Sequence, residues 1–247
     1  MTLRLFYWNS KGWVEPSRLL LHYLKVDYEE ITWKDYDGYL AKKEVIFTDP
    51  LKTPFPNFPI LIDGDFVLSE HEVINYYLCK KYNRLDLYGK NLQDEVRVRQ
   101  MNALMTKVYD LIIDNAIVGG DYTTFLTNAF KEDGDIAQSI QSLAGFLADK
   151  DFLVGYLTLS DFRASYQLKY FRNAALSVGL EDPIVGKHDN LVALIKRVDG
   201  LPELEGYFGS ARDHQYTPEV LAHWFKEFPL RVKSTQRTNY REKLPFW

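Results

Sequence analysis

The stretch FPNFPILIDGDFVLSEHEVI, residues 55–74, predicts a turn, two strands and a helix within twenty residues. Proline has no amide hydrogen to give to a sheet, so Pro59 belongs at the start or edge of a strand, and an X-Pro bond can be cis in a tight turn. Asp63-Gly64 between two apolar runs indicates a hairpin. Ser69 and Glu72 have the spacing of a capping box, which predicts the start of a helix. A strand edge beside a helix N-terminus suits a small peptide that carries a carboxylate.

The residues before this stretch complete an α/β unit. Residues 3–8 alternate like a half-buried strand, Pro16 opens a helix with apolar residues at helical spacing, and residues 28–33 predict a second strand. This order predicts a thioredoxin-like domain over residues 1–83. Its redox form needs a Cys-x-x-Cys motif, which is absent, and the single cysteine, Cys79, is expected to be a buried helix residue.

The rest of the chain predicts helices. Residues 84–92 form a linker, and residues 93–228 form an all-helical domain whose second long helix is interrupted near Gly134. Thr158 and Asp161 form a capping box with a role in folding.

Residues 229–247 form a basic tail, with five Lys and Arg residues against one acid. Such a segment is usually solvated, but its aromatic and arginine residues also suit packing on the protein's own body or on a protein partner.

Composition narrows the class of protein. A length of 247 residues with 46% hydrophobic residues spread along the chain predicts two domains, each with a core, and no transmembrane segment. We expect no leader peptide, because the first strand begins at once, and therefore a cytoplasmic protein. A single cysteine excludes an internal disulfide, and a formal charge of -4 argues against a nucleic-acid binder.

Several segments together resemble the cytosolic glutathione transferases, closest to the mu and sigma classes; they are LFYW (5–8), RLLL (18–21), YEE (28–30), FPNFP (55–59) and IDGD (62–65). The resemblance covers the N-terminal unit and, more weakly, the next 130 or so residues. It implies glutathione as co-substrate without a metal, a small hydrophobic electrophile as second substrate, and a homodimer formed through the helical domain and the rim of the N-terminal one.

The chemistry of such an enzyme needs a group that holds a thiol as its anion. The pKa of a free cysteine thiol is about 8.5, so little of it is thiolate at neutral pH. A phenol donates a hydrogen bond to the thiolate, and Tyr7 matches the family's tyrosine at the end of the first strand. Ser10 is the alternative donor if Tyr7 points inward.

The resemblance also implies a glutathione site. The backbone of Phe58, before Pro59, is expected to pair with the cysteinyl backbone as a short antiparallel rung. Trp8, Trp13 and Asn57 align with positions that flank the peptide, and each has packing as its alternative role. Lys43 stands in the place of the family's lysine for the glycyl carboxylate, with a solvated surface lysine as the alternative.

Two departures from the family pattern concern glutathione binding. Glu70-His71 replaces the usual Gln-Ser or Glu-Ser pair: Glu70 can receive the ammonium group, whereas the ring of His71 either donates to the carboxylate or fills the pocket. Lys107 replaces an acid that reaches the partner's glutathione, with Asp110 as substitute.

Two functions follow from these features. The first is an enzyme that conjugates or isomerises using glutathione, with an electrophile between Trp13, Tyr109 and the helical domain. The second, motivated by His71, Lys107 and the tail, is a scaffold subunit in a larger assembly, since a fold does not guarantee a function.

Overall fold

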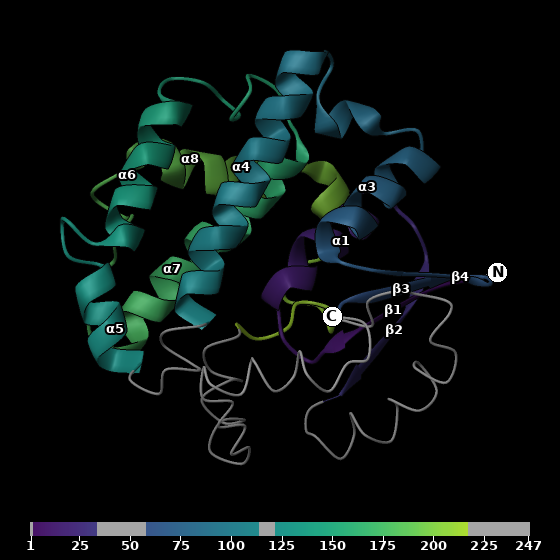
Figure 1. Cartoon of the computed structure of the whole chain (residues 1–247), viewed down its shortest axis with the longest axis horizontal. Helices are drawn as coiled ribbons and strands as arrows, with labels where there is room; N and C mark the ends of the chain where they lie inside the picture. Colours follow the sequence, from purple (N-terminus) through teal and green to yellow (C-terminus); the bar gives the residue numbers. More distant parts are fainter. Residues whose placement is uncertain (1, 34–57, 114–121, 217–247) are drawn as a thin grey trace, which may run out of the picture.

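A computed structural model of the chain describes residues 2–33, 58–113 and 122–216 (Figure 1). Lys43, Asn57, the end of the predicted helical domain from residue 217 and the basic tail lie outside the described residues.

Four strands form one mixed sheet in the order β2-β1-β3-β4. β1 is parallel to β2 and antiparallel to β3, and β3 and β4 form the predicted hairpin, with Gly64 at a φ of 63°. Phe6 lies opposite Ile60, and Ile60 lies opposite Ser69. The end of β1, the start of β3 and the end of β4 therefore meet at one end of the sheet. The strands are β1 (Leu3–Trp8), β2 (Tyr28–Trp33), β3 (Ile60–Asp63) and β4 (Phe66–Ser69).

Helices make up the remaining described elements. In Figure 1, α1 and α3 lie between the sheet and the helices that follow, and α7 packs against α1, α4 and α8. The predicted break near Gly134 is confirmed, because α6 begins at Asp135. The helices are η1 (Gly12–Val14), α1 (Glu15–Tyr23), α3 (His71–Lys81), η2 (Leu85–Tyr88), α4 (Leu92–Leu111), α5 (Tyr122–Ala129), α6 (Asp135–Leu147), α7 (Leu159–Ser177), α8 (Asp189–Asp199) and η4 (Pro202–Leu204).

The central strand β1 is buried on both faces, so its description as a half-buried strand is wrong. Leu5 and Tyr7 belong to the core shared with the helices, whereas Phe6 packs on the opposite face with Trp33 and Ile60. The alternation of side chains along a strand sends Tyr7 toward the helices, and this decides where its hydroxyl lies.

The capping box at the start of α3 is wrong. Ser69 is the last residue of β4, and Glu70 occupies the cap position at a φ of 72° with no side-chain hydrogen bond to the helix. The second capping box is confirmed: Asp161, at the third position of α7, accepts from the amide of Thr158 at 2.7 Å and from its hydroxyl at 2.8 Å. Cys79 is fully buried in α3, as predicted.

Within the described ranges, every helix is too short or too polar to cross a lipid bilayer.

Candidate functional site

The predicted thiolate donor, Tyr7, lies one residue before the end of β1, and its side chain is buried. Its hydroxyl oxygen accepts a hydrogen bond from the backbone amide of Trp13 at 3.2 Å. Burial raises the pKa of the Tyr7 phenol well above its ordinary value, with the nearby Tyr109 adding to the rise. The hydroxyl therefore keeps its proton at neutral pH. Because the amide occupies one lone pair of the oxygen, the O–H proton is available to a further acceptor.

The loop between β1 and α1 is fixed from α1 by Arg18, whose side chain is fully buried. Its guanidinium donates to the backbone oxygens of Trp8 at 3.3 Å, Ser10 at 2.6 Å and Lys11 at 3.3 Å. Glu30 of β2 pairs with the same guanidinium at 2.5 Å and supplies the compensating charge. Ser10, the alternative donor, is itself buried in this loop.

Gly12 opens the turn that carries the amide to Tyr7. Its φ is +63°, in the region that favours glycine, and a Cβ atom there would lie 2.5 Å from the Tyr7 hydroxyl oxygen. Glycine at this position is therefore part of the hydroxyl's immediate surroundings.

Trp13 ties this loop to the helical part of the chain. Its indole Nε1 donates to the Asp110 carboxylate of α4 at 3.1 Å, and its ring packs edge-on against Tyr109 at a centroid distance of 5.3 Å. Between them and neighbouring residues remains a hollow of about 10 Å³, room for about one water molecule. Among the described residues, the space directly between Trp13 and Tyr109 is therefore smaller than an electrophile.

Phe58 lies at the same end of the sheet, just before β3, and its bond to Pro59 is cis. Its ring packs against Trp33 at a centroid distance of 4.7 Å and against Trp8 at 6.5 Å. Trp8 and Phe58 thus pack together at this end of the sheet, and their predicted places beside glutathione stay a prediction.

Glu70 and His71 reach this end of the sheet from β4. Glu70 is exposed, and His71 is the first residue of α3 and is 9% exposed. Burial, assisted by the positive charge of Arg163, lowers the pKa of His71 to about 3. The imidazole is therefore neutral at physiological pH and brings no positive charge to this end of the sheet.

A buried polar junction that the sequence analysis missed lies behind His71. Glu72 Oε1 pairs with Arg163 of α7 at 2.6 Å, and its Oε2 accepts from the side-chain amide of Asn102 of α4 at 3.2 Å. Asn102 in turn accepts from the Ser160 hydroxyl at 2.9 Å. These bonds join α3, which carries His71, to two helices of the second half of the chain. The single sequence has no signal for pairs 30 and 91 residues apart.

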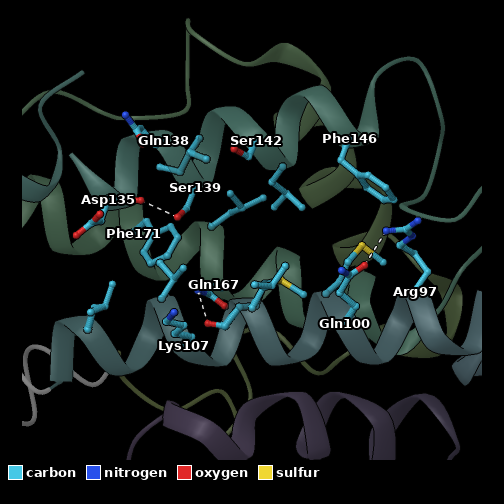
Figure 2. Close-up of a pocket in the computed structure, with 18 residues that line it drawn as sticks. Arg97, Gln100, Lys107, Asp135, Gln138, Ser139, Ser142, Phe146, Gln167 and Phe171 are labelled. Carbon is cyan, nitrogen blue, oxygen red and sulfur yellow. Dashed lines mark hydrogen bonds between the residues drawn. The ribbon is translucent and has the colours of Figure 1, made fainter. Parts of the chain in front are cut away.

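Lys107, which replaces an acid of the family, and Asp110, the expected substitute, have different surroundings. Lys107 lines a groove of about 610 Å³ between α4 and α6, with Gln167 and Phe171 of α7 beneath it (Figure 2). Asp110, expected to reach a partner's glutathione, accepts a hydrogen bond from Trp13 of its own chain. The apolar side chains that line the groove are Met101, Leu104, Met105, Val108, Leu111, Ile140, Leu143, Phe146, Leu168 and Phe171.

In the described part of the chain, His, Cys, Asp and Glu side chains form no group of three or more suited to holding a metal ion.

The amino-acid sequence of the chain matches a known protein family. Residues 1–80 match the family described as glutathione S-transferase, N-terminal domain. A glutathione S-transferase of Tyrophagus putrescentiae is 30% identical over 217 residues, covering 82% of this chain and 88% of the relative. Glutathione S-transferase Mu 1 of Oryctolagus cuniculus is 29% identical over 216 residues, covering 86% and 93%. The chain therefore belongs to the glutathione S-transferase family.

Two solved structures support the fold. The glutathione S-transferase Blo t 8 superposes with a TM-score of 0.71 at 24% identity, covering 85% of this chain and 93% of that one. The rat protein hPGDS, solved in complex with a quinoline, gives a TM-score of 0.67 at 20% identity, covering 84% and 96%. The expected fold, a thioredoxin-like N-terminal part followed by helices, is confirmed.

Proposed function

We propose that this member of the family is a mu-like glutathione transferase that joins the sulfur of glutathione to small hydrophobic electrophiles. The observation that carries the proposal is the position of the Tyr7 hydroxyl: a protonated phenol from the end of β1, on the side of the sheet that faces the helices, whose oxygen accepts from the Trp13 amide at 3.2 Å.

Tyr7 acts as a hydrogen-bond donor to the sulfur anion. The bond forms with the thiolate and not with the thiol, so it lowers the pKa of the bound thiol. The thiol gives its proton to solvent, the sulfur lone pair forms a C–S bond with the electrophile, and the leaving group departs with its bonding electrons. A fall of two units from about 8.5 needs about 2.7 kcal/mol of differential stabilisation.

The remaining site residues have roles that follow from their places at the sheet end. The Phe58 backbone pairs with the cysteinyl unit, Glu70 receives the ammonium group, and neutral His71 offers one ring N–H to the γ-glutamyl carboxylate. Trp8 and Trp13 flank the peptide. Outside the described residues, Lys43 and Asn57 complete the site by family resemblance.

The assembly and cellular role belong to the same proposal. We infer a homodimer in which the apolar groove between α4 and α6 is covered by the second subunit, because family members are generally dimeric. The protein works in the cytoplasm, in detoxification, without nucleic acid or membrane insertion, and the basic tail is available to a protein partner.

The decisive measurement is the conjugation of glutathione to a reactive aryl halide. Tyr7→Phe should lose at least tenfold in kcat/KM, because it removes only the donor. Tyr156→Phe is the matched control, since it removes a phenol hydroxyl that pairs with Asp94, far from the sheet end. Wild-type activity equal to the buffer blank, with no calorimetric heat on titration with glutathione, would refute the enzyme and favour the scaffold.

A further inference from the structure

We propose that Asp110 is a positioning residue: through the indole of Trp13, it holds the backbone amide that orients the Tyr7 hydroxyl. The inference rests on the proposed function and adds to it a residue of α4 that acts on Tyr7 through Trp13.

Two consecutive hydrogen bonds connect Asp110 to Tyr7. The carboxylate accepts from Trp13 Nε1 at 3.1 Å, and the backbone amide of the same tryptophan donates to the Tyr7 hydroxyl at 3.2 Å. Asp110 and Trp13 are 97 residues apart, so this bond joins the second half of the chain to the loop beside the sheet. A displacement of Trp13 therefore changes the bond that the Tyr7 oxygen accepts.

The acceptor end of this connection is rigid. Tyr109, the neighbour of Asp110, is buried and packs against Trp13 and against Tyr170 of α7, with ring centroids 5.3 Å and 4.8 Å apart. The Tyr166 hydroxyl also donates to the Tyr109 hydroxyl at 3.4 Å. Asp110 thus projects from a helix whose position is fixed by aromatic packing.

Trp13, the donor of both hydrogen bonds, lies in η1, a single turn of three residues, Gly12–Val14. Because this turn is so short, the position of Trp13 depends on bonds to other parts of the chain. Arg18 holds the carbonyls on the N-terminal side of this turn, at Ser10 and Lys11. On the tryptophan itself, the bond to Asp110 is the polar anchor of the side chain. Hydrogen bonds weaken steeply with misalignment, so loss of this anchor allows the amide to turn away from the Tyr7 oxygen.

The effect on catalysis is specific. An amide that occupies one lone pair of the Tyr7 oxygen leaves the O–H proton to the sulfur, whereas a released hydroxyl can rotate away from it. The substitutions below leave two nearby positive charges in place. The Arg18 guanidinium lies 5.7 Å from the Tyr7 ring, and the charge of Arg163 interacts with that of Asp110. The thiol of bound glutathione should therefore become a weaker acid when the bond is removed.

The test is the pH dependence of kcat/KM for an aryl halide with glutathione saturating, which reports the acidity of the bound thiol. Asp110→Leu and Trp13→Phe each remove the hydrogen bond from one side, and the second keeps an aromatic ring. Both should raise the apparent pKa of the bound thiol by about 0.5–1 unit. The rate at pH 6.5 should then fall about three- to tenfold and approach the wild-type rate at high pH. The KM for glutathione should stay within about twofold of the wild-type value.

Rescue by a conservative variant separates the bond from the charge. Asp110→Asn keeps an oxygen acceptor for Trp13 and should retain the wild-type profile. Glu95→Gln, which removes a carboxylate from an exposed pair with Arg99 on the same helix, is the control for the change of charge. The double variant Trp13→Phe/Asp110→Leu should be no worse than the poorer single variant, because both remove one interaction.

Three results would overturn the inference: an unshifted profile in Asp110→Leu and Trp13→Phe, an equal loss at every pH, or a shift in Asp110→Asn as large as that in Asp110→Leu. If Asp110→Leu does not fold, Trp13→Phe decides alone. An inactive wild type would refute the proposed function, whereas an active wild type with unshifted variants refutes only the role of Asp110.

Discussion

The ion pair between Glu72 and Arg163 should respond asymmetrically to the removal of its two partners. Arg163 Nη1 lies 2.6 Å from Glu72 Oε1, and the arginine side chain is 4% exposed while the glutamate side chain is 33% exposed. Burial lowers the pKa of Arg163 below its ordinary value, although the charge of Glu72 opposes this. The arginine therefore depends on its partner more than the glutamate does.

The magnitudes follow from this difference in burial. Glu72→Leu leaves a buried guanidinium without its carboxylate and should lower the free energy of unfolding by about 3–4 kcal/mol. Arg163→Met leaves a carboxylate that water reaches and that still accepts from Asn102 at 3.2 Å, so its cost should be about 1–2 kcal/mol. The double variant, with an apolar pair, should be more stable than Glu72→Leu alone.

Urea unfolding followed by tryptophan fluorescence measures these differences. All variants are compared at one protein concentration, because the stability of a dimer depends on it. The slopes against urea should agree, so that midpoints report stability. If Arg163→Met destabilises the protein as much as Glu72→Leu or more, the argument from burial is refuted.

Three further outcomes are expected. The pKa of His71 is about 3 in the fold against 6.5 in the unfolded chain, so its contribution to stability is lost as pH falls below about 6.5. Between pH 7 and pH 5, the free energy of unfolding measured with urea should therefore fall by about 2 kcal/mol less in His71→Gln than in the wild type. Equal falls in the two proteins would contradict the neutral ring. Asp161→Ala leaves the amides of Leu153 and Thr158 and the Thr158 hydroxyl without their acceptor. It should lower the free energy of unfolding by about 3 kcal/mol or more, whereas Thr158→Ala should lower it by about 1 kcal/mol. The reverse order would exclude Asp161 as the main acceptor. Gly12→Ala pushes a Cβ atom into the Tyr7 hydroxyl and should lower kcat/KM at least tenfold with glutathione binding retained in calorimetry; full activity would remove Tyr7 from the reaction.

The sequence was sufficient where a few adjacent residues decide the structure. Asp63-Gly64 forms the hairpin between β3 and β4, and Thr158 with Asp161 caps α7, because turn and cap geometry depend on residues within one turn of the chain. The fold class and the place of Tyr7 at the end of β1 followed from such local patterns together with the family resemblance.

The remaining features depend on residues that are distant in sequence. Ser69 and Glu72 have the spacing of a capping box, but α3 begins one residue later than that spacing predicts, at His71, and the Glu72 carboxylate pairs with Arg163, 91 residues away. The charge of His71 likewise depends on burial by helices that a local pattern does not place. Burial and pairing between distant residues thus explain both the wrong predictions and the contacts that the sequence did not predict.

The orientation of the Tyr7 hydroxyl requires both halves of the chain. Arg18 holds the β1–α1 loop from within the α/β unit, and Asp110 holds Trp13 from α4. A third support comes from the end of the described chain, where Asp213 pairs with Lys11 at 2.6 Å and the Gln215 carbonyl accepts from the Lys11 amide at 2.8 Å. The α/β unit supplies the phenol, but two of the three supports for the loop beside it come from the helical half. Changes in α4 or near residue 213 should therefore act on the acidity of the thiol through the loop, without contact with the substrate.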